Sequence, residues 1–135
     1  VYENTIKGNK IDLEQLPIPR HWPLDGGRYA GTADAVITRD PDTNYLNVGT
    51  YRMMLQGKNT TGLYLSPGKD ARLHIARAWG QGKSLQVAAA WGIDPLYMLV
   101  GSQSFPKNVS EYEYAGGIKG GDVFAKCDRI DEAQA

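Results

Sequence analysis

The chain has 135 residues, and its 15 Lys and Arg balance its 15 Asp and Glu, so the formal net charge is zero. This length is enough for one hydrophobic core, which predicts a single domain over residues 1–135. A neutral chain without runs of basic residues is not typical of proteins that bind nucleic acids or anionic membranes. No apolar run exceeds five residues, whereas a membrane-spanning helix needs about 20.

The cysteine and histidine content argues against the common metal and redox motifs. Cys127 is the only cysteine and cannot form an internal disulfide, which favours a reducing, cytoplasmic location. His21 and His74 are the only histidines, and neither has a second ligand at zinc-site spacing. The sequence therefore gives no indication of a zinc centre or of a Ser-His-Asp triad.

The first half of the chain predicts an arm followed by a β-hairpin. Residues 1–25 are expected to form an extended connector arm, because three prolines between residues 17 and 23 fix the backbone and remove amide donors. β-Favouring residues at 33–39 and 45–55 flank the turn-forming segment Asp40–Asn44, which predicts a hairpin. Another short strand is expected at residues 61–65, before Ser66-Pro67-Gly68.

The second half of the chain predicts short helices and two more strands. Apolar residues at helical spacing predict a helix over residues 69–79, and the apolar segment 85–91 predicts a strand buried on both faces. Asp94 as N-cap and Pro95 in the first helical position predict a helix that ends at Gly101. Ser110 and Glu113 form a capping box for a helix that ends near residues 116–117, and residues 123–126 are a last strand candidate. This pattern indicates an α+β fold built on an antiparallel sheet or barrel.

The second hairpin strand carries unusual polar residues. Alternation along a strand places three of its side chains on one face and three on the other: Asn47, Gly49 and Tyr51 against Val48, Thr50 and Arg52. The Asn47 oxygen suits Mg²⁺ or Mn²⁺, and the Arg52 guanidinium suits a carboxylate or phosphate. By composition alone, an exposed strand with a surface arginine explains the pattern equally well.

A series of short motifs resembles the UbiD family of decarboxylases in its order and spacing. The motifs are Leu16-Pro-Ile-Pro, Asp25-Gly-Gly, Ile37-Thr-Arg-Asp-Pro, Asn47–Met53, Gly57-Lys-Asn, Ser110-Glu-Tyr and Lys126-Cys. The resemblance runs from about Leu16 to Asp128 and implies a flavin-binding, antiparallel split β-barrel, similar to FMN-binding split barrels. Family chains are several-fold longer, so the chain is expected to be the central cofactor-binding part of a (de)carboxylase.

The resemblance also implies an activity and a set of site residues. Family members use prenylated FMN as an electron sink to decarboxylate, or carboxylate, aromatic and α,β-unsaturated acids. Asn47 and Glu111 match metal-binding residues for Mn²⁺ or Mg²⁺, with K⁺ as a further candidate ion, and Arg52 matches the arginine that contacts the substrate carboxylate. The residues that match the stretches along the flavin phosphate are Thr50, Tyr51, Tyr64, Leu65 and Ser66.

The segment Ser66–Asp70 departs from family members that carry a metal-binding His there. Asp70 is an alternative ligand for a hard cation, and Lys69 could neutralise the flavin phosphate. A solvated helix start explains both residues without a ligand. Glu111 and Glu113 have a similar alternative, because carboxylates in the first turn of a helix are favoured by about 0.3–1 kcal/mol without any metal.

Two other functions remain open at this stage. One is a metal-independent flavin reductase with a split-barrel fold, and the other is a non-catalytic, truncated subunit whose exposed aromatic residues form an interface. By resemblance, the family's proton donor and the glutamate of its Glu-Arg-Glu network lie beyond Ala135, so the chain alone is expected to be inactive. The intact protein is expected to form a homo-oligomer through its C-terminal part.

Overall fold

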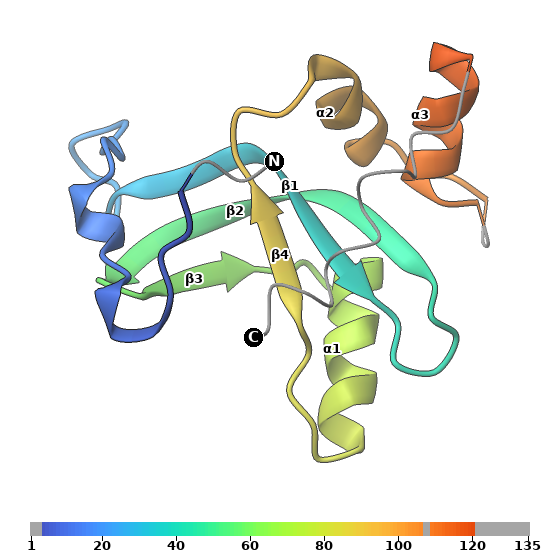
Figure 1. Cartoon of the computed structure of the whole chain (residues 1–135), viewed down its shortest axis with the longest axis horizontal. Coiled ribbons are helices and arrows are strands. Elements are labelled where there is room, and N and C mark those ends of the chain that lie inside the picture. Colours follow the sequence, from blue (N-terminus) through green and yellow to red (C-terminus); the bar gives the residue numbers. More distant parts are fainter. Residues whose placement is uncertain (1–3, 107–108, 121–135) are drawn as a thin grey trace.

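The computed structural model describes residues 4–106 and 109–120. In this part, four antiparallel strands form one sheet in the order β3-β2-β1-β4, with helices on both of its faces (Figure 1). The strands are β1 (Tyr29–Arg39), β2 (Leu46–Gly57), β3 (Thr60–Tyr64) and β4 (Val87–Ala90). The helices are α1 (Asp70–Gly80), α2 (Pro95–Gly101) and α3 (Glu111–Lys119), with short 3-10 turns η1 (Gly8–Lys10) and η2 (Leu13–Gln15). The antiparallel α+β prediction is therefore confirmed.

The hairpin of β1 and β2 is the centre of the sheet. Its register runs from Arg39 opposite Leu46 to Tyr29 opposite Met54. The connecting turn closes where the Asp40 amide donates to the Tyr45 carbonyl at 2.8 Å. Asn44 adopts a left-handed backbone conformation (φ 60°) there, which asparagine tolerates better than most residues. The predicted hairpin is confirmed, with a first strand that begins earlier than the β-favouring residues indicated.

Side-chain caps define the starts of α2 and α3, as the sequence predicted. The Asp94 side chain accepts a hydrogen bond from the Leu96 amide at the start of α2. At the start of α3, Ser110 and Glu113 form the reciprocal capping box. Helix α3 extends beyond the predicted end and stops at Lys119, because Gly120 provides the left-handed cap.

Two small cores lie on opposite faces of the sheet, since neighbouring residues of a strand point to opposite sides. On one face, Val36, Tyr51 and Met53 pack against Ala71 of α1. On the other face, Ala35 and Val48 pack against Tyr112 of α3. Strand β2 therefore contributes to both cores and holds α1 and α3 on either side of itself.

Four expectations about the fold need correction or stay open. The segment 85–91 is not buried on both faces: among the described strands β4 lies at the edge of the sheet, and its Val87 is 43% exposed, because burial depends on the position in the sheet rather than on an apolar run. The described strands form an open sheet, so closure into a split barrel is not confirmed, and the strand predicted at 123–126 lies outside the described residues. The arm contains η1 and η2 and is not extended throughout.

None of the described helices is long and apolar enough to cross a membrane.

Strand β1 contains a buried carboxylate, that of Asp34. The register of β1 shifts between Gly31 and Asp34, and within the described part of the chain the buried Asp34 carboxylate oxygens have no hydrogen-bond partner of normal geometry. Burial raises the pKa of Asp34, and its own backbone amide and the nearby Trp91 indole offset only part of that rise. The ionised carboxylate therefore destabilises the folded state.

We expect Asp34→Asn to increase the free energy of unfolding by about 1 kcal/mol at pH 8, because the amide carries no charge. A folded-state pKa above the unfolded value means that the wild type loses stability as pH rises from 3.8 through the folded pKa. The advantage of the variant should thus shrink as pH falls toward 3.8. Urea unfolding between pH 4 and 8 measures this difference, with Glu14→Gln in the exposed arm as control; an equal gain at all pH values would contradict it.

Candidate functional site

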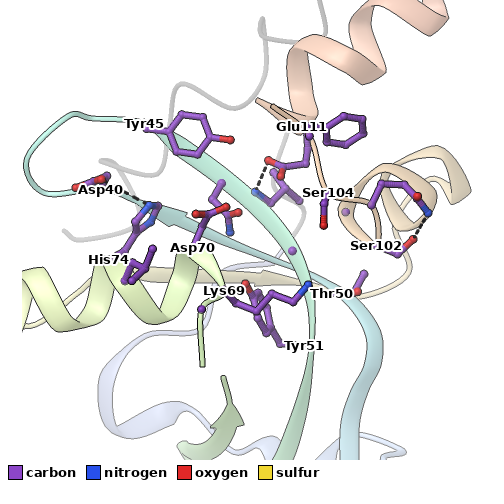
Figure 2. Close-up of a pocket in the computed structure, with 18 of the residues that line it drawn as sticks. Asp40, Tyr45, Thr50, Tyr51, Lys69, Asp70, His74, Ser102, Ser104 and Glu111 are labelled. Carbon is purple, nitrogen blue, oxygen red and sulfur yellow. Dashed lines mark hydrogen bonds and ion pairs between the residues drawn. The ribbon is translucent and has the colours of Figure 1, made fainter. Parts of the chain in front are cut away.

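A cavity of about 470 Å³ lies between strand β2, the first turn of α1 and the segment that joins α2 to α3. Figure 2 shows Tyr45, His74 and Asp70 on one side of the cavity and Thr50 and Ser102 on the opposite side, with Glu111 between Tyr45 and Ser104. The cavity therefore gathers polar side chains from regions far apart in the sequence.

An edge of β2 that no described strand pairs with lines this cavity. Strand β3 pairs with β2 only from Arg52 onward, so among the described strands residues 46–51 have a neighbour on one side only. The Val48 amide points away from β1 and donates to Glu111 Oε2 at 2.9 Å. Successive amides of a strand point in opposite directions, so the Thr50 amide, two residues after Val48, also points away from β1. The N-terminal ends of α1 and α3, where backbone amides lack intrahelical partners, flank this edge and favour an anion there.

Glu111 is fixed at the start of α3 by its neighbours. The Ser110 hydroxyl donates to the Leu46 carbonyl at 3.0 Å, which ties the helix start to β2. Glu111 is 6% exposed, and burial raises the pKa of its carboxyl. The hydrogen bond from the Val48 amide lowers this pKa, whereas the negative charge of Asp70 raises it further. A bound cation would compensate the two carboxylates.

Asn47 lies on the α1 side of β2, with Tyr51 as its neighbour on that face. Asn47 is 3% exposed, and its Nδ2 has no hydrogen-bond partner of normal geometry among the described residues. A flip of the amide exchanges Nδ2 and Oδ1, so the same space can receive its oxygen. Burial raises the pKa of the Tyr51 hydroxyl, and the Ala71 backbone amide and Asn47 counteract part of this effect.

The donor set fits a hard cation that also receives oxygen ligands from a bound molecule. Asn47 and Glu111 both line the cavity and provide an amide and a carboxylate, which suit Mg²⁺ or Mn²⁺. Asp70 lines the same cavity but is exposed. Within residues 4–106 and 109–120, no three His, Cys, Asp or Glu side chains are grouped to hold a metal. Protein carboxylates alone therefore do not complete a site in this part of the chain.

The other predicted residues divide into two groups. Thr50, Tyr51 and Lys69 line the cavity, and Lys69 is the N-cap of α1. The remaining candidates, Arg52, Tyr64, Leu65 and Ser66, do not line it.

Arg52 is exposed, and its Cζ lies 5.8 Å from the centre of the Tyr29 ring. It is paired with Tyr64 of β3, which is 67% exposed. Alternation along β2 places Arg52 on the same sheet face as Val48 and Thr50. Arg52 therefore lies outside the cavity wall, farther along the same face of β2.

Tyr45 and His74 also line the cavity, although neither was among the site residues predicted from the sequence. The Tyr45 hydroxyl donates to the Val109 carbonyl at 3.1 Å. Burial, together with the charges of Glu111, Asp70 and Glu113, raises the pKa of Tyr45 to about 12. His74 is buried, and burial lowers its pKa despite the nearby Asp40 carboxylate. The spacing of Asp70 and His74, four residues apart on one helix, was the signal that could have indicated a shared face.

Comparison with known proteins identifies the family. The model of the UbiD family, described as 3-octaprenyl-4-hydroxybenzoate carboxy-lyase Rift-related domain, matches residues 1–134. Phenolic acid decarboxylase of Escherichia coli O157:H7 is 38% identical over 122 residues, which are 87% of this chain and 26% of the relative. Ferulic acid decarboxylase 1 of Saccharomyces cerevisiae is 35% identical over 131 residues, which are 93% of this chain and 26% of the relative.

Solved structures agree with this result. Vanillic acid decarboxylase of Sedimentibacter hydroxybenzoicus, in its closed form, has a TM-score of 0.81 at 33% identity and covers 88% of this chain and 26% of its own. The UbiD-class enzyme HmfF of Pelotomaculum thermopropionicum, in an evolved dimeric form in complex with prFMN, has a TM-score of 0.79 at 31% identity, over 84% of this chain and 26% of its own. The chain belongs to the UbiD family, as its motifs predicted, and it spans about a quarter of the length of these relatives.

Proposed function

We propose that this chain supplies the cofactor and metal pocket of a carboxy-lyase that uses prenylated FMN, and that the intact protein decarboxylates, or in reverse carboxylates, aromatic or α,β-unsaturated acids. The observation that carries the proposal is the convergence of buried Asn47 and Glu111 with two helix N-terminal ends on the edge of β2 that no described strand pairs with. UbiD relatives named for phenolic and ferulic acids support the reaction class.

Each residue has a role in this proposal. Asn47 and Glu111, with Asp70 as a further ligand, would hold Mn²⁺ or Mg²⁺ beside the bound cofactor, and K⁺ is a further ion for the same region. The residues that hold the phosphate end are Thr50, Tyr51 and Lys69, and the stretch Tyr64, Leu65 and Ser66 lies farther along the cofactor. When bound, prenylated FMN supplies the electron sink for breaking the bond to the carboxylate.

Arg52 is proposed to bind the substrate carboxylate. The proposal is supported by the position of Arg52 on the same sheet face as Thr50, two residues farther along β2. A guanidinium can bind a carboxylate with two parallel hydrogen bonds, which would orient the bond that breaks. The proton donor and any homo-oligomeric contacts are assigned to other parts of the intact protein.

The proposal is tested by CO₂ release from phenolic and cinnamic acids by the intact protein loaded with prenylated FMN and Mn²⁺. We expect activity in the wild type and a loss of about 100-fold in kcat/KM for Arg52→Ala, because the carboxylate loses its charged partner. Arg72→Ala, on the exposed side of α1, is the matched control and should retain activity. Reduction of free flavin by NAD(P)H, without decarboxylation or metal dependence, would favour the flavin reductase instead.

A further inference from the structure

Tyr45 connects strand β2 to the start of α3. Its hydroxyl donates to the Val109 carbonyl at 3.1 Å, and Val109 immediately precedes the N-cap Ser110 and Glu111. Tyr45 itself is the last residue before β2 and lies two positions before Asn47. A single hydrogen bond therefore links the strand that carries Asn47 to the helix turn that carries Glu111.

His74 connects the first turns of α1 to the same hairpin. Its Nδ1 lies 3.0 Å from Thr38 Oγ1 of β1, in a buried contact, and its Nε2 lies 3.8 Å from Asp40 Oδ2. Asp40 also pairs with Arg77 of α1, so the helix is attached to the hairpin at two places. Asp70 lies one helical turn before His74, and the two share a face of the helix.

Tyr45 and His74, which make these two connections, meet at one wall of the cavity. The rings of Tyr45 and His74 stand edge to face, with centres 6.2 Å apart and planes at 82°. Figure 2 shows this pair beside Asp70 and on the opposite side of the cavity from Ser102. Without a cation, the carboxylates of Asp70 and Glu111 repel each other, so their approach needs a rigid frame.

We propose that Tyr45 and His74 are positioning residues that set the distance between the first turns of α1 and α3, and so between Asp70 and Glu111, which line the same cavity as Asn47. The inference rests on the proposed function, since it makes these contacts part of the metal and phosphate pocket. Neither residue needs to touch the metal or the flavin. They act through the helix ends that they hold.

The test uses variants that remove one contact at a time. Tyr45→Phe keeps the ring beside His74 but removes the hydrogen bond to Val109. His74→Leu removes the contact with Thr38, whereas His74→Asn keeps a polar atom near the position of Nδ1 and should rescue it. Tyr114→Phe and His21→Asn are controls, because both residues are exposed and lie outside the cavity wall.

Two quantities are measured at a temperature where circular dichroism shows every variant folded: hydrogen exchange of the Val48 amide, which donates to Glu111, and binding of FMN in the presence of Mn²⁺. For Tyr45→Phe and His74→Leu we expect exchange of the Val48 amide about 10-fold faster and FMN affinity about 10-fold weaker, as the loss of one hydrogen bond predicts. His74→Asn should recover most of both quantities, and the controls should match the wild type.

The outcomes separate this inference from the proposed function. A lower melting temperature with unchanged Val48 exchange and unchanged FMN affinity would show a merely structural role and overturn the inference. Wild-type binding of FMN with Mn²⁺ that neither variant weakens would also overturn it, while the proposed function stands. If the wild type binds no FMN with Mn²⁺ but both variants accelerate Val48 exchange, the proposed function fails and the assignment of these contacts to a metal and phosphate pocket fails with it, and the variants then show only that Tyr45 and His74 hold the start of α3 against β2.

Discussion

Replacing Glu111 with glutamine is expected to weaken Mn²⁺-dependent FMN binding by about 100-fold and to leave the fold intact. The glutamine oxygen can still accept the hydrogen bond that the Val48 amide donates at 2.9 Å, so the contact between α3 and β2 is retained. The negative charge, however, is lost from a position where it is buried and close to Asp70. A divalent cation bound here loses one of its anionic ligands.

The matched control lies in the same helical turn. Glu113→Gln also removes one negative charge, but Glu113 does not line the cavity, and glutamine can replace glutamate in a capping box. Titration of both variants with FMN, with and without Mn²⁺, separates the loss of a metal ligand from a general change in charge. Equal affinity in the two variants would show that Glu111 is a structural residue of α3 and not a metal ligand.

The parts of the fold that local signals determine were predictable from the sequence. The capping box at Ser110 and Glu113 requires only residues three positions apart, and the turn at Asp40–Asn44 needs only its own residue types. Among the described strands β4 pairs only with β1, and no feature within residues 87–90 encodes that edge position. Sheet order is a property of the whole chain, so the burial of this strand could not be derived from its apolar residues.

The candidate site also contains some residues that were predictable from the sequence and others that were not. Asn47 and Glu111 were predicted from family motifs, and the structure brings them to one cavity. Tyr45 and His74 belong to the same cavity, but their roles depend on contacts with Val109 and Thr38, which lie far from them in the chain. Neither residue type nor spacing indicates such contacts. Residues that hold other site residues in position are therefore harder to predict from one sequence than residues that face the ligand.

Substitution of Gly49 by alanine is expected to destabilise the fold by about 3 kcal/mol and to disrupt the candidate site at the same time. A Cβ atom at Gly49 would lie 2.5 Å from Cε2 of Tyr51 and 2.9 Å from its hydroxyl oxygen. Tyr51 is 8% exposed and packs with Val36, Met53 and Ala71, so its ring has little room to move. Any displacement of the ring also disturbs Asn47, its neighbour on the same face of β2.

The control for this substitution lies in the same strand. A Cβ atom at Gly57 would meet no atom within 4 Å, so Gly57→Ala should change the free energy of unfolding by less than about 0.5 kcal/mol. Urea unfolding of both variants gives the two stabilities. The double variant Gly49→Ala with Tyr51→Leu tests the cause, because removing the ring should make the alanine far less harmful in that background. If Gly49→Ala is equally destabilising with and without the Tyr51 ring, the close approach of Tyr51 is not what requires glycine at this position.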